Sequence, residues 1–166
     1  MTPSWDLFIM LFFIAITAYG FLLQRDKAVV TMISIYVALV ITAIATDPIQ
    51  AFFSGEKAFM NQIFIRGNTN TFTIQVILFL STIGIVSTKS GIEGKNSESS
   101  VIETFGLSFL NSALIVSTIL LYMDPAKREG IMQTSRLANA LVNYHFWWIV
   151  LPIMLLVFTG FSKKSN

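Results

Sequence analysis

The chain contains no cysteine and few charged residues. Cys is 0 in 166 residues, and only 12% of the residues are Asp, Glu, Lys or Arg. The lack of cysteine excludes disulfides, thiol catalysis and thiolate metal sites. A soluble domain carries roughly 25% charged residues, so this chain has too few charges to cover the surface of a soluble protein. The net charge of +2 comes without a basic tract, and nucleic acid is therefore not an expected partner.

The sequence also lacks the short motifs of common enzymes. It has no GxSxG, HExxH, Walker or glycine-rich dinucleotide motif, and no Ser/His/Asp set with evident partners. The one histidine, His145, stands in an aromatic run without a nearby carboxylate, which makes a poor metal site. We therefore expect no catalytic residue, no cofactor and no metal, and we class the chain as a non-enzyme.

Five apolar runs dominate the sequence, and each is about as long as a bilayer is thick. A helix of ~20 apolar residues crosses the ~30 Å hydrocarbon core. The runs use almost the whole chain, which indicates a single integral membrane domain over residues 1–166. The first run lacks signal-peptide features and is interpreted as a retained span. The five runs are Trp5–Leu23, Ala28–Thr46, Thr71–Thr88, Val101–Met123 and Val142–Phe161.

Two more polar segments with helical patterning lie between these runs. Asp47-Pro48 is typical of an N-cap followed by the first residue of a helix, and the residues from there to Phe64 have amphipathic spacing. Ala126–Leu141 predicts a second interfacial helix, with a cap near Thr134 or Ser135. Residues 90–100 are rich in Gly, Ser and charge, and predict an exposed loop.

The predicted fold class is all-α. It is a polytopic transmembrane helical bundle of four or five spans, with one or two interfacial amphipathic helices. The last run is the least secure span, because Pro152 would kink it and because it could re-enter instead of crossing. An acidic N-terminal tail, a basic first hinge and a basic last tail weakly favour an outside N-terminus and an inside C-terminus.

Small residues recur at helical spacing in two of the predicted spans. Positions four residues apart in the second span build one stripe on a helix, and the fourth span carries a similar set. Such stripes let helix backbones approach closely. We expect packing seams within the subunit, and the alternative for the second-span stripe is a subunit–subunit seam or a pore lining. The predicted packing residues are Ser34, Ala38, Thr42, Gly106, Ser108 and Ser112.

Ionisable groups within the spans are few, and two carboxylates are candidates for function. Asp6 is expected beside Trp5 at the membrane edge, where a carboxylate can stay hydrated. Glu103 lies one turn into the fourth span, where the helix dipole favours an acid. The alternative for Glu103 is a carboxylate that faces a polar cavity inside the bundle.

Four neutral or basic residues complete the set of candidate functional polar residues. Asn111 and Gln75 are expected to form hydrogen bonds between helices, with a permeation site as the alternative. Ser135 and Arg136 are expected in a loop contact or a helix cap.

Several dispersed features follow one another in a familiar order. Trp5-Asp6 opens the first span, Gly20-Phe21 precedes a basic hinge, Glu103 enters the fourth span, and Ser135–Leu137 follows it. In this order and spacing the chain resembles the colicin V production protein (CvpA) family, which has an aromatic–Asp start, a Gly-Phe-basic turn, an Asp entering the fourth span, and a later Ser-x-Leu segment.

The resemblance implies a helical, multi-pass protein of the bacterial inner (plasma) membrane with an outside N-terminus. The family is linked to colicin V export and envelope integrity. Some relatives fuse the same membrane module to a periplasmic serine protease; this sequence contains no such segment, so an enzymatic role does not carry over. We therefore expect a non-enzymatic accessory or scaffold protein in export or envelope integrity.

The alternative function is a subunit of a small oligomeric channel or transporter. Polar residues on the third and fourth spans motivate it, if they form one cluster. In either case the expected partners are the lipid bilayer and either a second copy of the chain or another membrane-complex component. The residues of the expected cluster are Gln75, Glu103, Ser108, Asn111 and Ser112.

Overall fold

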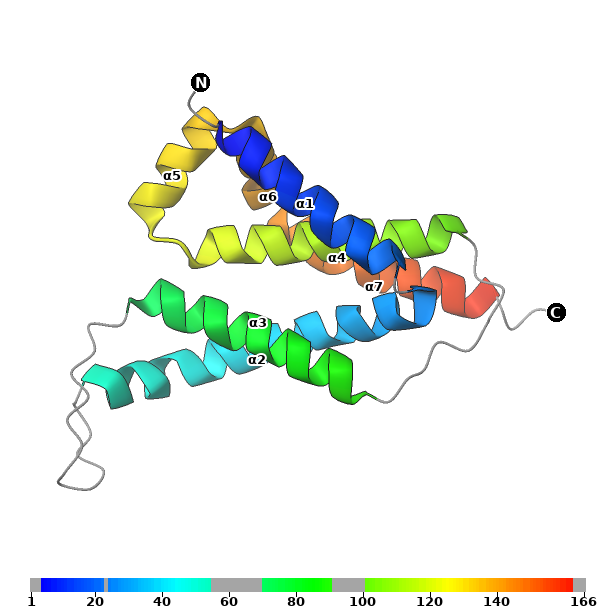
Figure 1. Ribbon diagram of the computed structural model, residues 1–166, viewed down its shortest axis with the longest axis horizontal. Coiled ribbons are helices and arrows are strands. Elements are labelled where there is room, and N and C mark those ends of the chain that lie inside the picture. Colours follow the sequence, from blue (N-terminus) through cyan, green and yellow to red (C-terminus); the bar gives the residue numbers. More distant parts are fainter. Residues whose placement is uncertain (1–3, 23, 55–69, 91–100, 163–166) are drawn as a thin grey trace.

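The computed structural model describes residues 4–22, 24–54, 70–90 and 101–162, and these residues fold into seven helices without a strand among them (Figure 1). The all-α prediction is therefore confirmed. Residues 91–100 of the loop predicted over residues 90–100, and residues 55–64 of the predicted amphipathic segment, lie outside the described residues. The helices are α1 (Trp5–Leu22), α2 (Gln24–Ser54), α3 (Thr71–Lys89), α4 (Val101–Tyr122), α5 (Pro125–Thr134), α6 (Arg136–Asn143) and α7 (His145–Ser162).

Helix α4 is the centre of the bundle. Helices α1, α2 and α7 pack directly on it, and α3 lies mainly against α2 (Figure 1). Twelve residues of α4 are buried, whereas α1 buries only Ile9 and Thr17. Side chains of α2, α3 and α4 form one apolar cluster around the fully buried Phe79. The other helices therefore take their positions from α4 or from α2.

Four helices are long and apolar enough to cross a membrane. They are the helices over Trp5–Leu22, Arg25–Phe53, Thr71–Lys89 and Val101–Tyr122. A fifth span results if Arg136–Asn143 and His145–Phe158, which meet at a 65° bend, count as one. This agrees with the predicted number of four or five. Large apolar side chains such as Leu11, Ile44 and Phe158, each 69% exposed, cover the outer surface, which suits contact with lipid better than contact with water.

Helix α2 is longer than predicted because it continues through Asp47-Pro48. The prediction that a new helix begins there is wrong: Pro48 lies inside α2. Proline keeps a φ angle that a helix accepts and removes one backbone hydrogen bond, and apolar helices tolerate this when nearby polar groups adjust. At 31 residues and 1.5 Å per residue, α2 is about 46 Å long, which exceeds the hydrocarbon thickness.

Two short helices, rather than one, follow α4. Asp124 caps α5 by accepting a hydrogen bond from the Ala126 amide at 3.0 Å, with Pro125 at the first position. Ser135 ends α5 in an extended conformation and also caps α6.

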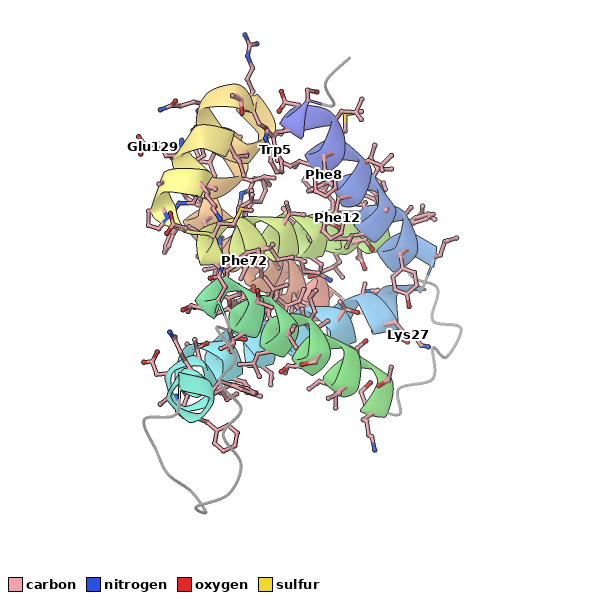
Figure 2. The ribbon with its side chains drawn as sticks, turned by 60° about the vertical axis from the view of Figure 1, so that its left-hand side comes forward. Trp5, Phe8, Phe12, Lys27, Phe72 and Glu129 are labelled. Carbon is pink, nitrogen blue, oxygen red and sulfur yellow. The ribbon has the colours of Figure 1, made fainter. Side chains whose placement is uncertain are left out.

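Figure 2 shows Glu129 of α5 toward the same end of the bundle as Trp5, with Lys27 toward the other end.

The last apolar run breaks at Tyr144 and not at Pro152. Helix α6 ends at Asn143 and α7 begins at His145, while Pro152 is buried inside a continuous α7. The hydroxyl of Tyr36 on α2 donates a 2.6 Å hydrogen bond to the carbonyl of Ile149, in the turn that Pro152 weakens. Pro152 leaves the carbonyl of Trp148, four residues earlier, without its helical amide donor, and the Tyr36 bond joins α2 to α7 at the next carbonyl.

Candidate functional site

The polar side chains of the candidate spans gather on α4. They lie among the contacts with α1, α2 and α7 instead of facing outward. In a helix, residues three and four apart are neighbours, so most of this set forms a continuous band along one side. The buried polar residues of α4 are Thr104, Ser108, Asn111, Ser112, Ser117 and Thr118.

Helix α1 is held to α4 by a chain of hydroxyl groups. The Thr17 hydroxyl donates to Ser112 Oγ at 2.9 Å, and Ser112 Oγ donates in turn to the Ser108 carbonyl at 2.7 Å. One turn further along α1, Gly20 faces Ser108: a Cβ atom on this glycine would lie 3.0 Å from Ser108 Oγ. The absence of a side chain at Gly20 therefore lets the two helices approach closely.

Helix α2 is held to α4 by an amide and by an ion pair. Asn111 Nδ2 donates to the carbonyl of Ala28 at 2.8 Å, and this bond is buried. Arg25 Nε lies 2.9 Å from Glu103 Oε2, and both side chains are partly buried. Both contacts join the first turns of α2 to the first half of α4. The predicted interhelical role of Asn111 matches this geometry, and Glu103 meets a cation rather than an open polar cavity.

Helix α7 is held to α4 through its first residue. His145 Nδ1 lies 2.9 Å from Ser117 Oγ, and Ser117 is completely buried. Ser117 Oγ also donates to the carbonyl of Leu114 at 3.1 Å. The contact with His145 fixes the start of α7 beside α4, directly after the bend at Tyr144.

A second polar cluster joins α1 to α6 at the end of the bundle. Asp6 Oδ1 accepts hydrogen bonds from the Ser135 hydroxyl and from the Leu137 amide, the latter at 3.1 Å. Ser135 Oγ itself accepts from the Ala138 amide at 3.0 Å. The carboxylate thus lies at the N-terminus of α6, where free amides and the helix dipole favour a negative charge. Ser135 is the helix cap that the sequence left as one of two options.

The structure separates the polar residues that the sequence placed in one cluster. Ser108, Asn111 and Ser112 lie together on α4, and Glu103 lies at the start of that helix. Gln75 is half-buried near the start of α3. The start of α3 lies toward the opposite end of the bundle from the start of α4, which carries Glu103 (Figure 1). The expected five-residue site is therefore a three-residue group with two outlying members.

The remaining candidates have simpler surroundings. Arg136 is exposed at the first position of α6. Gly106 faces α7, where an added Cβ atom would meet Leu155 at an ordinary 3.5 Å. Ser34, Ala38 and Thr42 are completely buried inside the chain. Their stripe therefore contributes to packing within this bundle.

Sequence reasoning missed two partners in these contacts. Arg25 was not paired with Glu103, although a first-turn acid in an apolar span needs a cation within reach. Asp6 was not paired with Ser135, which follows it by 129 residues. Among the described residues, no group of three His, Cys, Asp or Glu side chains is placed to hold a metal ion.

Comparison of the chain with protein families, with curated proteins and with solved structures finds no match. The interpretation of the site therefore rests on its own geometry.

The contact between Asp6 and α6 predicts a coupled effect of two substitutions. We expect Asp6→Ala and Ser135→Ala each to lower the thermal unfolding temperature and to accelerate hydrogen exchange at the Leu137 amide several-fold, because each frees the N-terminus of α6. The double variant should be less destabilised than the sum of the two, since both act on one interaction. Thermal unfolding in detergent and amide exchange by mass spectrometry measure these effects.

Asp47→Ala is the matched control, because Asp47 is an exposed aspartate on α2. It should leave both measurements unchanged. Strict additivity of the Asp6 and Ser135 substitutions would show that the carboxylate does not act on the α6 cap.

Proposed function

We propose that the chain is an integral membrane protein in which α1 to α4 cross the bilayer and α6 with α7 forms one broken fifth span. We place it in the bacterial inner membrane with its N-terminus outside. In this proposal it acts as a non-enzymatic accessory or scaffold protein in export or envelope integrity, like the colicin V production proteins that its sequence resembles.

The observation that carries the proposal is that polar side chains of α1, α2 and α4 are bonded between the helices. A carrier or a membrane enzyme keeps such groups available to its substrate. Here Thr17, Ser112 and Asn111 are bonded between helices, and the charged Arg25 has Glu103 beside it. These groups therefore build a rigid bundle, which is what a scaffold requires.

A second candidate function, a small channel or transporter subunit, has one specific observation in its favour. Ser108 Oγ and Asn111 Oδ1 are buried polar atoms without a hydrogen-bond partner in the described structure. Unpaired buried polar groups typically cost about 1–3 kcal/mol each, and they often mark sites where a polar solute binds. A scaffold should give no solute or ion flux in liposomes, whereas a channel or transporter subunit should give flux.

The proposed topology predicts which cysteines a membrane-impermeant thiol reagent can reach. The chain has no cysteine, so single substitutions give an unambiguous result. From outside the cell, Lys127→Cys should be labelled, because Lys127 is exposed on α5. Lys27→Cys, Lys89→Cys and Ser165→Cys should be labelled only after permeabilisation.

The Ser165→Cys variant decides the course of the last run. Labelling of that variant from the same side as Lys127→Cys would show that the α6–α7 pair re-enters, and would contradict the broken fifth span. Labelling of Lys27→Cys from outside would reverse the orientation.

The proposed role predicts a defect in the cell without transport by the purified protein. We expect deletion of the gene to weaken the envelope, measured as sensitivity to detergents and bile salts, and to lower secretion of colicin V from a cell that carries its export system. Protein in liposomes should give no ion or solute flux above that of empty vesicles.

Flux that disappears in Asn111→Leu but persists in Ser81→Leu would instead establish the channel or transporter function. Ser81 is a suitable control because it is an exposed polar residue on α3. A deletion strain with a normal envelope and normal secretion would contradict the scaffold role.

A further inference from the structure

Two deeply buried polar atoms of α4 belong to side chains that are neighbours on this helix. Ser108 is 1% exposed and Asn111 is 4% exposed, yet Ser108 Oγ and Asn111 Oδ1 have no hydrogen-bond partner among the described residues. The rest of the Asn111 amide is occupied, because its Nδ2 donates to the Ala28 carbonyl. The free acceptor is thus held in a fixed orientation by the bond on its other side.

The two residues lie at the junction of three helices. They are three positions apart on α4, which makes them neighbours on its surface with Cβ atoms about 5–6 Å apart. Ser108 faces α1 at Gly20, and Asn111 faces α2 at Ala28. Helices α1 and α2 follow one another directly in the chain (Figure 1). The unpaired atoms therefore flank the line along which α1 and α2 meet on α4.

The chemistry of this pair fits a small molecule that both donates and accepts hydrogen bonds. A serine hydroxyl can do either, whereas an amide oxygen only accepts. A ligand must therefore donate to Asn111 and can donate to Ser108 or accept from it. Buried polar groups that lack a protein partner are usually bonded to ordered water, which needs two or more polar partners.

We infer that one water molecule is bound at the junction of α1, α2 and α4, where it bridges Ser108 Oγ and Asn111 Oδ1. It donates one hydrogen to the amide oxygen and shares a second hydrogen bond with the hydroxyl. This water links the contact that holds α1 to the contact that holds α2. The inference goes beyond the proposed function, because a scaffold and a channel could both contain the site.

Radiolytic labelling tests the inference directly. Hydroxyl radicals made by an X-ray pulse from a bound water oxidise side chains next to it, even when bulk water cannot reach them. The reporter is Met32, which is 4% exposed and packs with Ala28 and Leu107 beside the proposed site. We expect Met32 to be oxidised several-fold faster than its burial predicts, and to carry ¹⁸O after brief mixing with ¹⁸O-water.

The matched control is the methionine of a Leu114→Met variant. Leu114 is completely buried in the apolar cluster around Phe79, and exchange of leucine for methionine conserves volume. This methionine should be oxidised at the low rate of a dry core. An equal rate at Met32 in the wild type would overturn the inference.

Two substitutions assign the signal to the site. Asn111→Leu should bring the oxidation of Met32 down to the control rate, because it replaces the amide acceptor with an apolar side chain. Ser108→Ala should lower the oxidation partially, because the Asn111 acceptor remains. If Asn111→Leu does not fold, as judged by circular dichroism and gel filtration, the milder Ser108→Ala decides alone. A Met32 rate that neither substitution changes would also overturn the inference.

Discussion

The hydrogen bonds that α4 makes to its neighbours are the interaction on which the rest of the structure depends. Helix α1 buries only Ile9 and Thr17, so apolar packing alone does not define its position on α4. The Thr17–Ser112 bond and the close approach at Gly20 define that position. Asn111 does the same for α2. Between apolar helices such bonds are directional, whereas contacts between methyl groups are not.

The ends of the bundle use charge in a similar way. At one end Arg25 and Glu103 join the first turns of α2 and α4. At the other end Asp6 closes the N-terminus of α6 and ties α1 to the segment that follows α4. Each carboxylate lies in the first turn of a long apolar helix, where a charge is easier to accommodate than at the middle of a span. Charge thus contributes to fixing helix ends, beside the neutral bonds that Asn111 and Ser117 make to the starts of α2 and α7.

The sequence predicted the apolar helices well because length and composition define them: α1 and α3 begin at the predicted residues, and α4 runs from Val101 as expected. Prediction from the sequence failed where a helix boundary or a hydrogen-bond partner depends on contacts with another helix. Pro48 does not start a helix but lies inside α2, and the last run breaks at Tyr144, between α6 and α7, rather than at Pro152. The pairing of Asp6 with Ser135 is equally out of reach, since no local pattern connects residues so far apart. The individual polar candidates were found, but their partners were not.

The free energy of unfolding of Asn111→Leu tests most directly how much the hydrogen bonds of α4 to its neighbouring helices stabilise the bundle. Leucine adds apolar surface but cannot donate a hydrogen bond to the Ala28 carbonyl. We therefore expect the free energy of unfolding to fall by about 0.5–2 kcal/mol, the range for hydrogen bonds between membrane helices. Titration with a denaturing detergent, beside Ser81→Leu as the polar-to-leucine control, provides the comparison. Stability equal to or above that of Ser81→Leu would contradict the claim that polar contacts of α4 hold the bundle together.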